Sequence, residues 1–384
     1  MKVLIENGRI YPMDAPMIPE GYIIIEDGRF AQVGAMAHCP EWSGARIDAA
    51  GCIILPGLVD AHSHIGLFNE GLRFEGEDGN EDTDPITPQL RALDAVYPQD
   101  AAFAEARAAG VTTVVTGPGS ANPIGGQFIA MKTQGVCVDD MLLSPCAAMK
   151  FALGENPKMT YNQKDRAPVT RMGSAALIRE ALRKAREYQE QRDDPESDCD
   201  FDMKYEALLP LLSGEIGAQI HCHRADDIFT ALRIVREFGL RAALVHATEG
   251  YLVADRLASE NIPVIAGPIM TTRTKPELAR QSVTQAARLI AAGVPVAICT
   301  DYPEVLQDYL MLSAALAARE GLSDEQAFAA VTIEPARIIG LAHRIGSITP
   351  GKDADLVMYD GHPFDTRTRV REVWINGERN VEHA

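Results

Sequence analysis

Residues 55–66 read LPGLVDAHSHIG, an apolar run that ends in two histidines separated by one residue. Alternate side chains of a β-strand share a face, so His62 and His64 are expected to lie side by side at the end of a strand. Neutral imidazole is a common ligand of zinc and related cations. A lone pair of this kind is more often structural, so its meaning depends on what the rest of the chain places beside it.

The composition is that of a globular protein, since 46% of the 384 residues are hydrophobic and 23% are charged. The formal net charge of −18 repels phosphate, so neither nucleic acid nor a membrane is expected as a partner. The first residues contain no apolar core of a signal peptide, and no later stretch approaches the length of a membrane span. Seven cysteines without a CxxC pair indicate reduced thiols and a cytoplasmic location.

Both ends of the chain, residues 1–56 and 346–384, are rich in β-branched residues with Asn-Gly and Asp-Gly dipeptides that favour hairpins. Between them, in residues 57–345, apolar strands alternate with helical segments. The expected strands are 57–62, 111–116, 127–132, 147–152, 218–222, 242–246, 262–266 and 295–299. The expected helices are 98–109, 174–191, 226–238, 249–260, 282–292 and 306–320. This alternation predicts an α/β fold with a closed (β/α)8 TIM barrel; an open doubly wound sheet is the alternative.

Catalytic residues of such a barrel lie at the carboxyl ends of its strands. Besides the opening pair, potential metal ligands fall on the fourth, fifth, sixth and eighth strands: Lys150, His221, His246 and Asp301. Imidazole and carboxylate suit Zn²⁺, Mn²⁺ or Fe²⁺, and the lack of paired cysteines argues against a structural zinc ribbon. The pattern therefore predicts a catalytic metal site.

Five stretches carry a family resemblance: LPGLVDAHSHIG, AQIHCH, AALVHATEG, VAICTDYP and GSITPGKDADLVMYD. Together they resemble the metal-dependent amidohydrolase superfamily, especially its dihydroorotase-, hydantoinase- and imidazolonepropionase-like branches, over nearly the whole chain. The resemblance implies these metal ligands: His62, His64, His221, His246 and Asp301. It also implies a small β-sandwich domain, residues 1–56 plus 346–384, beside a barrel of residues 57–345, and a homo-oligomer that acts on a small-molecule substrate.

Two positions leave alternatives open. In the binuclear branches, a lysine on the fourth strand reacts with CO2 to give N6-carboxylysine, which bridges two metals. Lys150 is the matching residue, and burial beside cations would favour the neutral amine that this reaction needs. Glu155 is the rival bridging carboxylate. On the fifth strand, His223 replaces His221 as the ligand if the strand register slips by two residues; otherwise His223 faces the substrate.

The expected reaction is hydrolysis of an amide or cyclic amide C–N bond of a small molecule by a metal-activated hydroxide, with one or two Zn²⁺ ions. Asp301 is expected to accept the proton of the water and return it to the leaving nitrogen. The alternative is a mononuclear-metal deaminase of a heterocyclic or amidine substrate. Deaminases of this superfamily typically carry a glutamate three residues after the strand-five histidine, where this chain has Arg224, so hydrolysis is favoured.

Substrate contacts are expected from the loops at the strand ends, which vary in such barrels. The candidates are His223, Arg224, Gln127 and Arg273. Arginine can bind a carboxylate through two hydrogen bonds, and Lys275 could also bind one; ordinary surface ion pairs are the alternative for these cations. The acid-rich segment 69–84 is either a solvated loop or a mobile lid.

Overall fold

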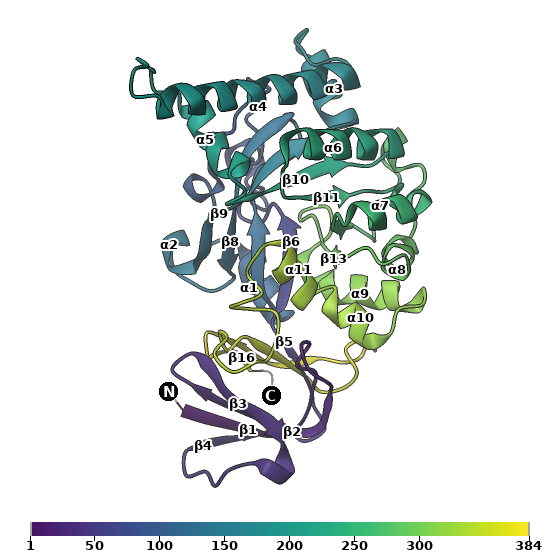
Figure 1. Ribbon diagram of the computed structural model, residues 1–384. Coiled ribbons are helices and arrows are strands. Elements are labelled where there is room, and N and C mark those ends of the chain that lie inside the picture. Colours follow the sequence, from purple (N-terminus) through teal and green to yellow (C-terminus); the bar gives the residue numbers. More distant parts are fainter. Residues whose placement is uncertain (1, 383–384) are drawn as a thin grey trace.

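The computed structural model describes residues 2–382, which form two eight-stranded sheets (Figure 1). One sheet contains strands from both ends of the chain. Its order is β16 (Glu378–Glu382), β15 (Val370–Ile375), β14 (Leu356–Tyr359), β5 (Ile53–Pro56), β1 (Lys2–Ile10), β2 (Ile18–Glu26) and β3 (Arg29–Ala35), and β4 (Ala45–Asp48) pairs with β1. Seven of these strands form one path, and β4 pairs with β1 beside it; the β-sandwich that the family resemblance implies stays a prediction. The predicted domain boundaries stay a prediction, and residues 1, 383 and 384 lie outside the described residues.

Hairpins in this sheet follow the expected dipeptides in two places. Asp27 and Gly28 join β2 to β3 with φ of 49° and 80°, and Asn376 and Gly377 join β15 to β16 with φ of 51° and 74°. Two successive positive φ angles are the conformation that closes a two-residue hairpin. Asn7-Gly8 behaves differently, because β1 runs through it with a register shift before Gly8. That dipeptide therefore forms an irregularity within a strand.

The second sheet holds all of the strands predicted for the barrel, in chain order. They are β6 (Leu58–Ser63), β7 (Val111–Thr116), β8 (Ile124–Lys132), β9 (Leu142–Ala152), β10 (Gly217–Cys222), β11 (Ala242–His246), β12 (Val264–Ala266) and β13 (Val296–Ile298). Its two edges meet just beyond the strand ends. Asp301 N donates to His62 O at 3.2 Å, and His64 N donates to Tyr302 O at 2.9 Å. The sheet is therefore a nearly closed barrel.

One strand departs from the all-parallel barrel that the sequence predicts, because β8 runs antiparallel to both β7 and β9. The reason lies in its connections, residues 117–123 before it and 133–141 after it. A parallel crossover needs a dozen or more residues, usually with a helix, and these segments are too short. The start of β8 therefore lies beside the carboxyl ends of β7 and β9.

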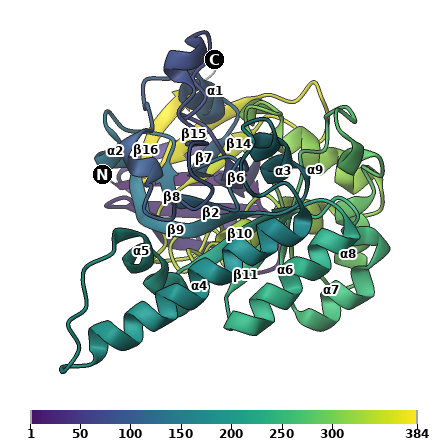
Figure 2. The same cartoon turned by 90° about the horizontal axis from the view of Figure 1, so that it is seen from above.

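Helices cover the outside of the barrel (Figures 1 and 2). Each predicted helix has a counterpart: α1 (Ala101–Ala108), α4 (Arg171–Asp193), α6 (Ala225–Phe238), α7 (Ala254–Glu260), α8 (Gln285–Ala291) and α9 (Leu310–Arg319). The others are α2 (Val138–Met141), α3 (Glu155–Asn162), α5 (Met203–Leu212), α10 (Asp324–Ala329) and α11 (Ile333–Ile338). Figure 2 shows α4 reaching beyond the rest of the molecule. Within residues 2–382, no helix has the length and apolar character that a membrane span requires.

Candidate metal centre

A cavity of about 360 Å³ lies at the carboxyl ends of the barrel strands. The residues that line it include His64, His221, His223, His246 and Asp301. A larger cavity, about 530 Å³, opens at the opposite end of the strands beside Gly217, Ala242 and Pro263. Catalytic groups of barrel enzymes gather at the carboxyl ends, so the smaller cavity is the candidate site.

One group of side chains, called here the aspartate half, consists of His64 and Asp301, which line the cavity, and of His62 and Lys150, which are fully buried beside them. Asp301 Oδ1 lies 3.4 Å from Nε2 of His62 and 3.4 Å from Nε2 of His64. Lys150 Nζ lies 3.2 Å from His62 Nε2, and the whole lysine side chain is buried. His62, Asp301 and the neighbouring His246 have ligand atoms within 4.8 Å of one another, which is close enough to hold one metal ion.

The orientation of His62 is set by Gln219 on β10. Gln219 Nε2 donates to the Ala61 carbonyl at 2.9 Å, so its Oε1, 2.6 Å from His62 Nδ1, is the acceptor for the Nδ1 proton. His62 Nε2 is then left with its lone pair toward the cavity. A buried partner of this kind fixes the tautomer that a metal ligand needs.

Two further rings are held in the same way by backbone carbonyls. His64 Nδ1 lies 2.7 Å from Gly117 O, in the loop after β7. His246 Nδ1 lies 2.7 Å from Gly267 O, in the loop after β12. Because a carbonyl only accepts, Nδ1 carries the proton in both rings and Nε2 is free to bind a cation.

The protonation states suit metal ligands as well. Burial lowers the pKa of His62 to about 3, assisted by the charge of Lys150, and burial lowers that of His246 to about 4. Burial opposes ionisation of Asp301, but His246, His62 and His64 lower its pKa well below the usual value. Burial also lowers the pKa of Lys150 to about 8, although Asp301 acts in the opposite direction. The site therefore combines neutral imidazoles with an ionised carboxylate.

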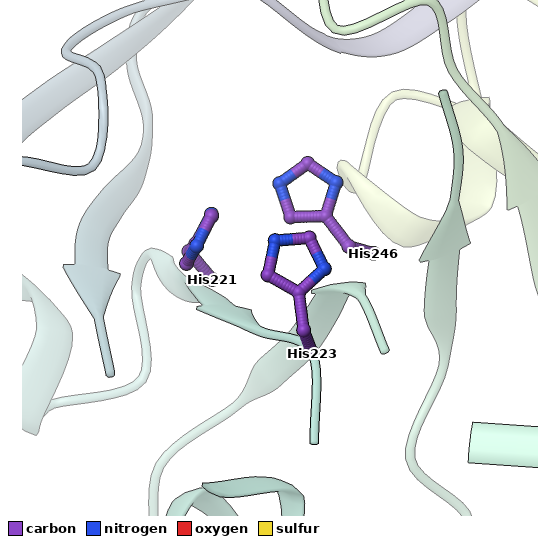
Figure 3. A group of neighbouring side chains, drawn as sticks. All are labelled: His221, His223 and His246. Carbon is purple, nitrogen blue, oxygen red and sulfur yellow. The ribbon is translucent and has the colours of Figure 1, made fainter. Parts of the chain in front are cut away.

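The other group, called here the glutamate half, consists of His221 and His223, which line the cavity, and of the buried Glu277 (Figure 3 draws the two histidines with His246). The ring centroid of His221 lies 4.7 Å from that of His223 and 4.6 Å from that of His246. These three histidines also have ligand atoms within 4.8 Å of one another. Both expected alternatives on the fifth strand thus lie in the cavity, and His246 lies between the two halves.

Several of the other predicted residues lie elsewhere. Arg224 is exposed and pairs with Asp226 at 2.9 Å, Arg273 is exposed and donates to Gln281 O at 2.9 Å, and Gln127 donates to Pro88 O at 3.3 Å. None of these three is among the described residues that line the cavity, whereas Lys275 is. Glu155, the rival bridging carboxylate, begins α3, and neither group of potential ligands in the described chain includes it or Glu277.

Gln219 and Glu277 were not expected from the sequence. Gln219 precedes His221 by two residues on the same strand, so the alternation of side chains could have placed it in the barrel interior beside the ligands. Glu277 belongs to a short 3-10 turn, Pro276–Leu278, in the loop after β12. A turn has no side-chain periodicity, so no sequence signal marks this residue.

Comparisons with known proteins agree on one family. Residues 215–381 match the family described as the Amidohydrolase family. The solved structure of an amidohydrolase from Thermotoga maritima MSB8 is 40% identical, with a TM-score of 0.95 and complete coverage of both chains. A protein named amidohydrolase tasK, from Hapsidospora irregularis, is 29% identical over 93% of this chain, which spans 39% of that protein's length. A 5-methylthioadenosine/S-adenosylhomocysteine deaminase from Moorella thermoacetica is 24% identical over 94% of this chain and 86% of its own.

Proposed function

Because this chain belongs to the metal-dependent amidohydrolase superfamily, whose members hydrolyse C–N bonds, we propose that it cleaves an amide or cyclic amide bond of a small molecule. The observation that carries this proposal is the convergence of His62 Nε2 and His64 Nε2 on Asp301 Oδ1 at the cavity. Their Nδ1 atoms are each held by an oxygen, which leaves both lone pairs facing the same carboxylate.

The ligands we assign to a first divalent cation, Zn²⁺ in the simplest case, are His62, His64 and Asp301. His221 and His246 would hold a second one. Lys150 lies beside the first group, and its lowered pKa, about 8, favours the neutral amine. That amine can add to CO2 and lose a proton to give N6-carboxylysine, whose two oxygens would bridge the cations. A bound divalent cation supplies Lewis acidity toward the scissile carbonyl and lowers the pKa of water.

Asp301 is the group we assign to proton transfer. It remains ionised next to the histidines, so it can accept a proton from the attacking water. The same carboxyl group can then return the proton to the leaving nitrogen. His223, which also lines the cavity, is within reach of a bound substrate.

A mononuclear deaminase is the second candidate, and a relative's name is the observation in its favour. Deaminases of this superfamily typically carry the acid that protonates a ring nitrogen three residues after the strand-five histidine. The residues after His223 do not supply it in this conformation, because Arg224 and Asp226 pair with each other at 2.9 Å, and neither is among the described residues that line the cavity. Hydrolysis therefore remains the better supported reaction.

We also propose a cytoplasmic homo-oligomer. All seven cysteines are free, which suits a reducing compartment. The net charge of −18 disfavours nucleic acid and anionic membranes as partners. Light scattering coupled to size-exclusion chromatography would measure the oligomeric state, and a monomer would contradict this part of the proposal.

Metal analysis of the purified protein, together with crystallographic density at Lys150, is the direct test. Two metals per chain and extra density on Nζ are expected. Removal of the metal by a chelator should abolish hydrolysis of a panel of N-acyl amino acids and cyclic amides, and reloading with Zn²⁺ should restore it. Metal-independent turnover would contradict the proposal, and one metal with a plain lysine and ammonia release from amino-substituted heterocycles would favour the deaminase.

A further inference from the structure

Three buried nitrogen atoms in the glutamate half have no hydrogen-bond partner among the described residues. They are Nδ1 and Nε2 of His221 and Nε2 of His223. Native proteins pair almost all of their buried polar atoms, and an exception usually marks an ion or water. The two rings are nearly perpendicular, at 88°, and their unpaired nitrogens lie beside the same cavity.

A buried carboxylate faces these nitrogens. Glu277 is 2% exposed, and its Oε1 lies 3.6 Å from His223 Nε2 and 3.9 Å from His221 Nε2. These separations exceed a hydrogen bond. They are close to the roughly 3.3–3.6 Å that separates two ligand atoms when each is about 2.0–2.2 Å from one tetrahedral cation.

Two contacts hold the carboxylate, one at each of its oxygens. Glu277 Oε2 accepts a hydrogen bond from Glu155 N at 3.0 Å. Lys275 Nζ lies 2.9 Å from Glu277 Oε1 and donates to Asn156 Oδ1 at 2.8 Å. These contacts favour the ionised carboxylate and orient it toward the histidines.

His223 is oriented as well. Its Nδ1 lies 2.7 Å from Thr248 Oγ1, which leaves Nε2 toward Glu277. Two histidines and one glutamate form a known ligand set of catalytic zinc, in which the fourth position stays open to water or substrate. All three side chains needed for such a set are therefore present in the glutamate half.

We propose that His221, His223 and Glu277 together hold a divalent cation in the glutamate half, so that both strand-five histidines are ligands and the loop after β12 supplies a carboxylate. The proposal rests on the proposed function, since it concerns the second cation of the same cavity. In this set His223 and Glu277 join His221 in place of His246, which is left to the first cation, where its ligand atom lies within 4.8 Å of those of His62 and Asp301.

The first experiment asks whether side chain 277 touches the metal. In the Co²⁺-loaded Glu277→Cys variant, a thiolate bound to the cation should give a near-ultraviolet sulfur-to-cobalt charge-transfer band that is absent from the Co²⁺-loaded wild type. Glu304→Cys is the control, because Glu304 is an exposed glutamate that lines the cavity and lies outside the proposed ligand set. No new band is expected there.

The second experiment uses Glu277→Gln, which keeps the size of the side chain and removes its charge. The affinity for the second Co²⁺ equivalent should fall by more than about 100-fold, beyond the 10- to 100-fold that is typical when only a supporting contact is lost. The affinity for the first equivalent should stay unchanged.

The proposal is overturned if folded Glu277→Cys shows no new band, or if Glu277→Gln binds two equivalents with wild-type affinities. Circular dichroism of both variants establishes folding, and Glu277→Gln, which is nearly isosteric, serves if the cysteine variant is unstable. A wild-type protein that binds no Co²⁺ would contradict the proposed function itself. Metal-dependent turnover that is the same in the wild type and in the Glu277 variants would contradict this inference alone.

Discussion

The aspartate half and the glutamate half of the cavity differ in how their rings are held. In the aspartate half, His62 and His64 each give their Nδ1 proton to an oxygen of Gln219 or Gly117. In the glutamate half, only His223 has such a partner, the hydroxyl of Thr248, and His221 has none among the described residues. The protein alone preorganises the first half, whereas under our proposal the second takes its final geometry from a bound cation.

The aspartate half should carry the proton transfer, and Asp301→Asn tests this most severely. The amide cannot accept the proton, so turnover should fall by about 10²- to 10⁴-fold. Metal content should stay near the wild-type value, because the histidines and the remaining oxygen still bind. Steady-state kinetics and metal analysis measure both, and normal activity of the variant would show that another group moves the proton.

Lys150→Ala tests whether a modified lysine joins the two halves. Loss of the bridge should lower turnover by on the order of 100-fold and release metal from the less preorganised glutamate half first. A short carboxylic acid should partly restore activity, because its two oxygens fit the space left by the lysine. Unchanged metal content with no response to added acid would argue for an unmodified lysine.

The fold was predictable where burial alone determines a strand. Apolar runs marked every barrel strand, because such strands are buried on both faces. The direction of β8 leaves no trace in that pattern, since a buried strand reads the same in either direction. The connection lengths, residues 117–123 and 133–141, carried the missing information.

The residues of the site also divide into those that the sequence predicts and those that it does not. His62, His64 and His246 fall at strand ends, where topology gathers side chains that are distant in sequence. Charge alone makes Arg224 and Arg273 candidates, and neither is among the described residues that line the cavity, because charge does not determine where a loop points. Glu277 lies on a turn, so only the tertiary structure brings it to the histidines.

The lowered pKa of Lys150 in the aspartate half predicts how carbamate formation depends on pH. In metal-free protein at a fixed concentration of dissolved CO2, carbamate formation on Lys150 requires the neutral amine, whose pKa is lowered to about 8 by burial. The initial rate of carbamate formation, which is proportional to the neutral amine, should rise about tenfold per pH unit below that value and level off above it, as ¹³C NMR can follow. Lys150→Ala is the control, and an initial rate that keeps rising toward pH 10 would indicate a lysine with an ordinary pKa.

Removing the hydrogen bond that orients His62 should weaken cation binding in the aspartate half. Gln219→Leu leaves the buried Nδ1 proton of His62 without an acceptor, so affinity for the first cation should fall by about 10- to 100-fold. Gln219→Glu keeps an acceptor oxygen and should lose less. Competition with a coloured chelator measures both constants, and equal affinities for wild type and Gln219→Leu would remove preorganisation as an explanation.

The smallest effect is expected from the corresponding change in the glutamate half. Thr248→Val keeps the shape of the side chain and deletes the hydroxyl that lies 2.7 Å from His223 Nδ1. One hydrogen bond of this kind corresponds to about a 2- to 10-fold change in affinity, here for the second cation only, and Thr248→Ser should behave as wild type. If Thr248→Val instead weakens cation binding as strongly as Gln219→Leu does, the protein orients the ligands of the glutamate half as firmly as those of the aspartate half. The glutamate half would then have its final geometry before a cation binds.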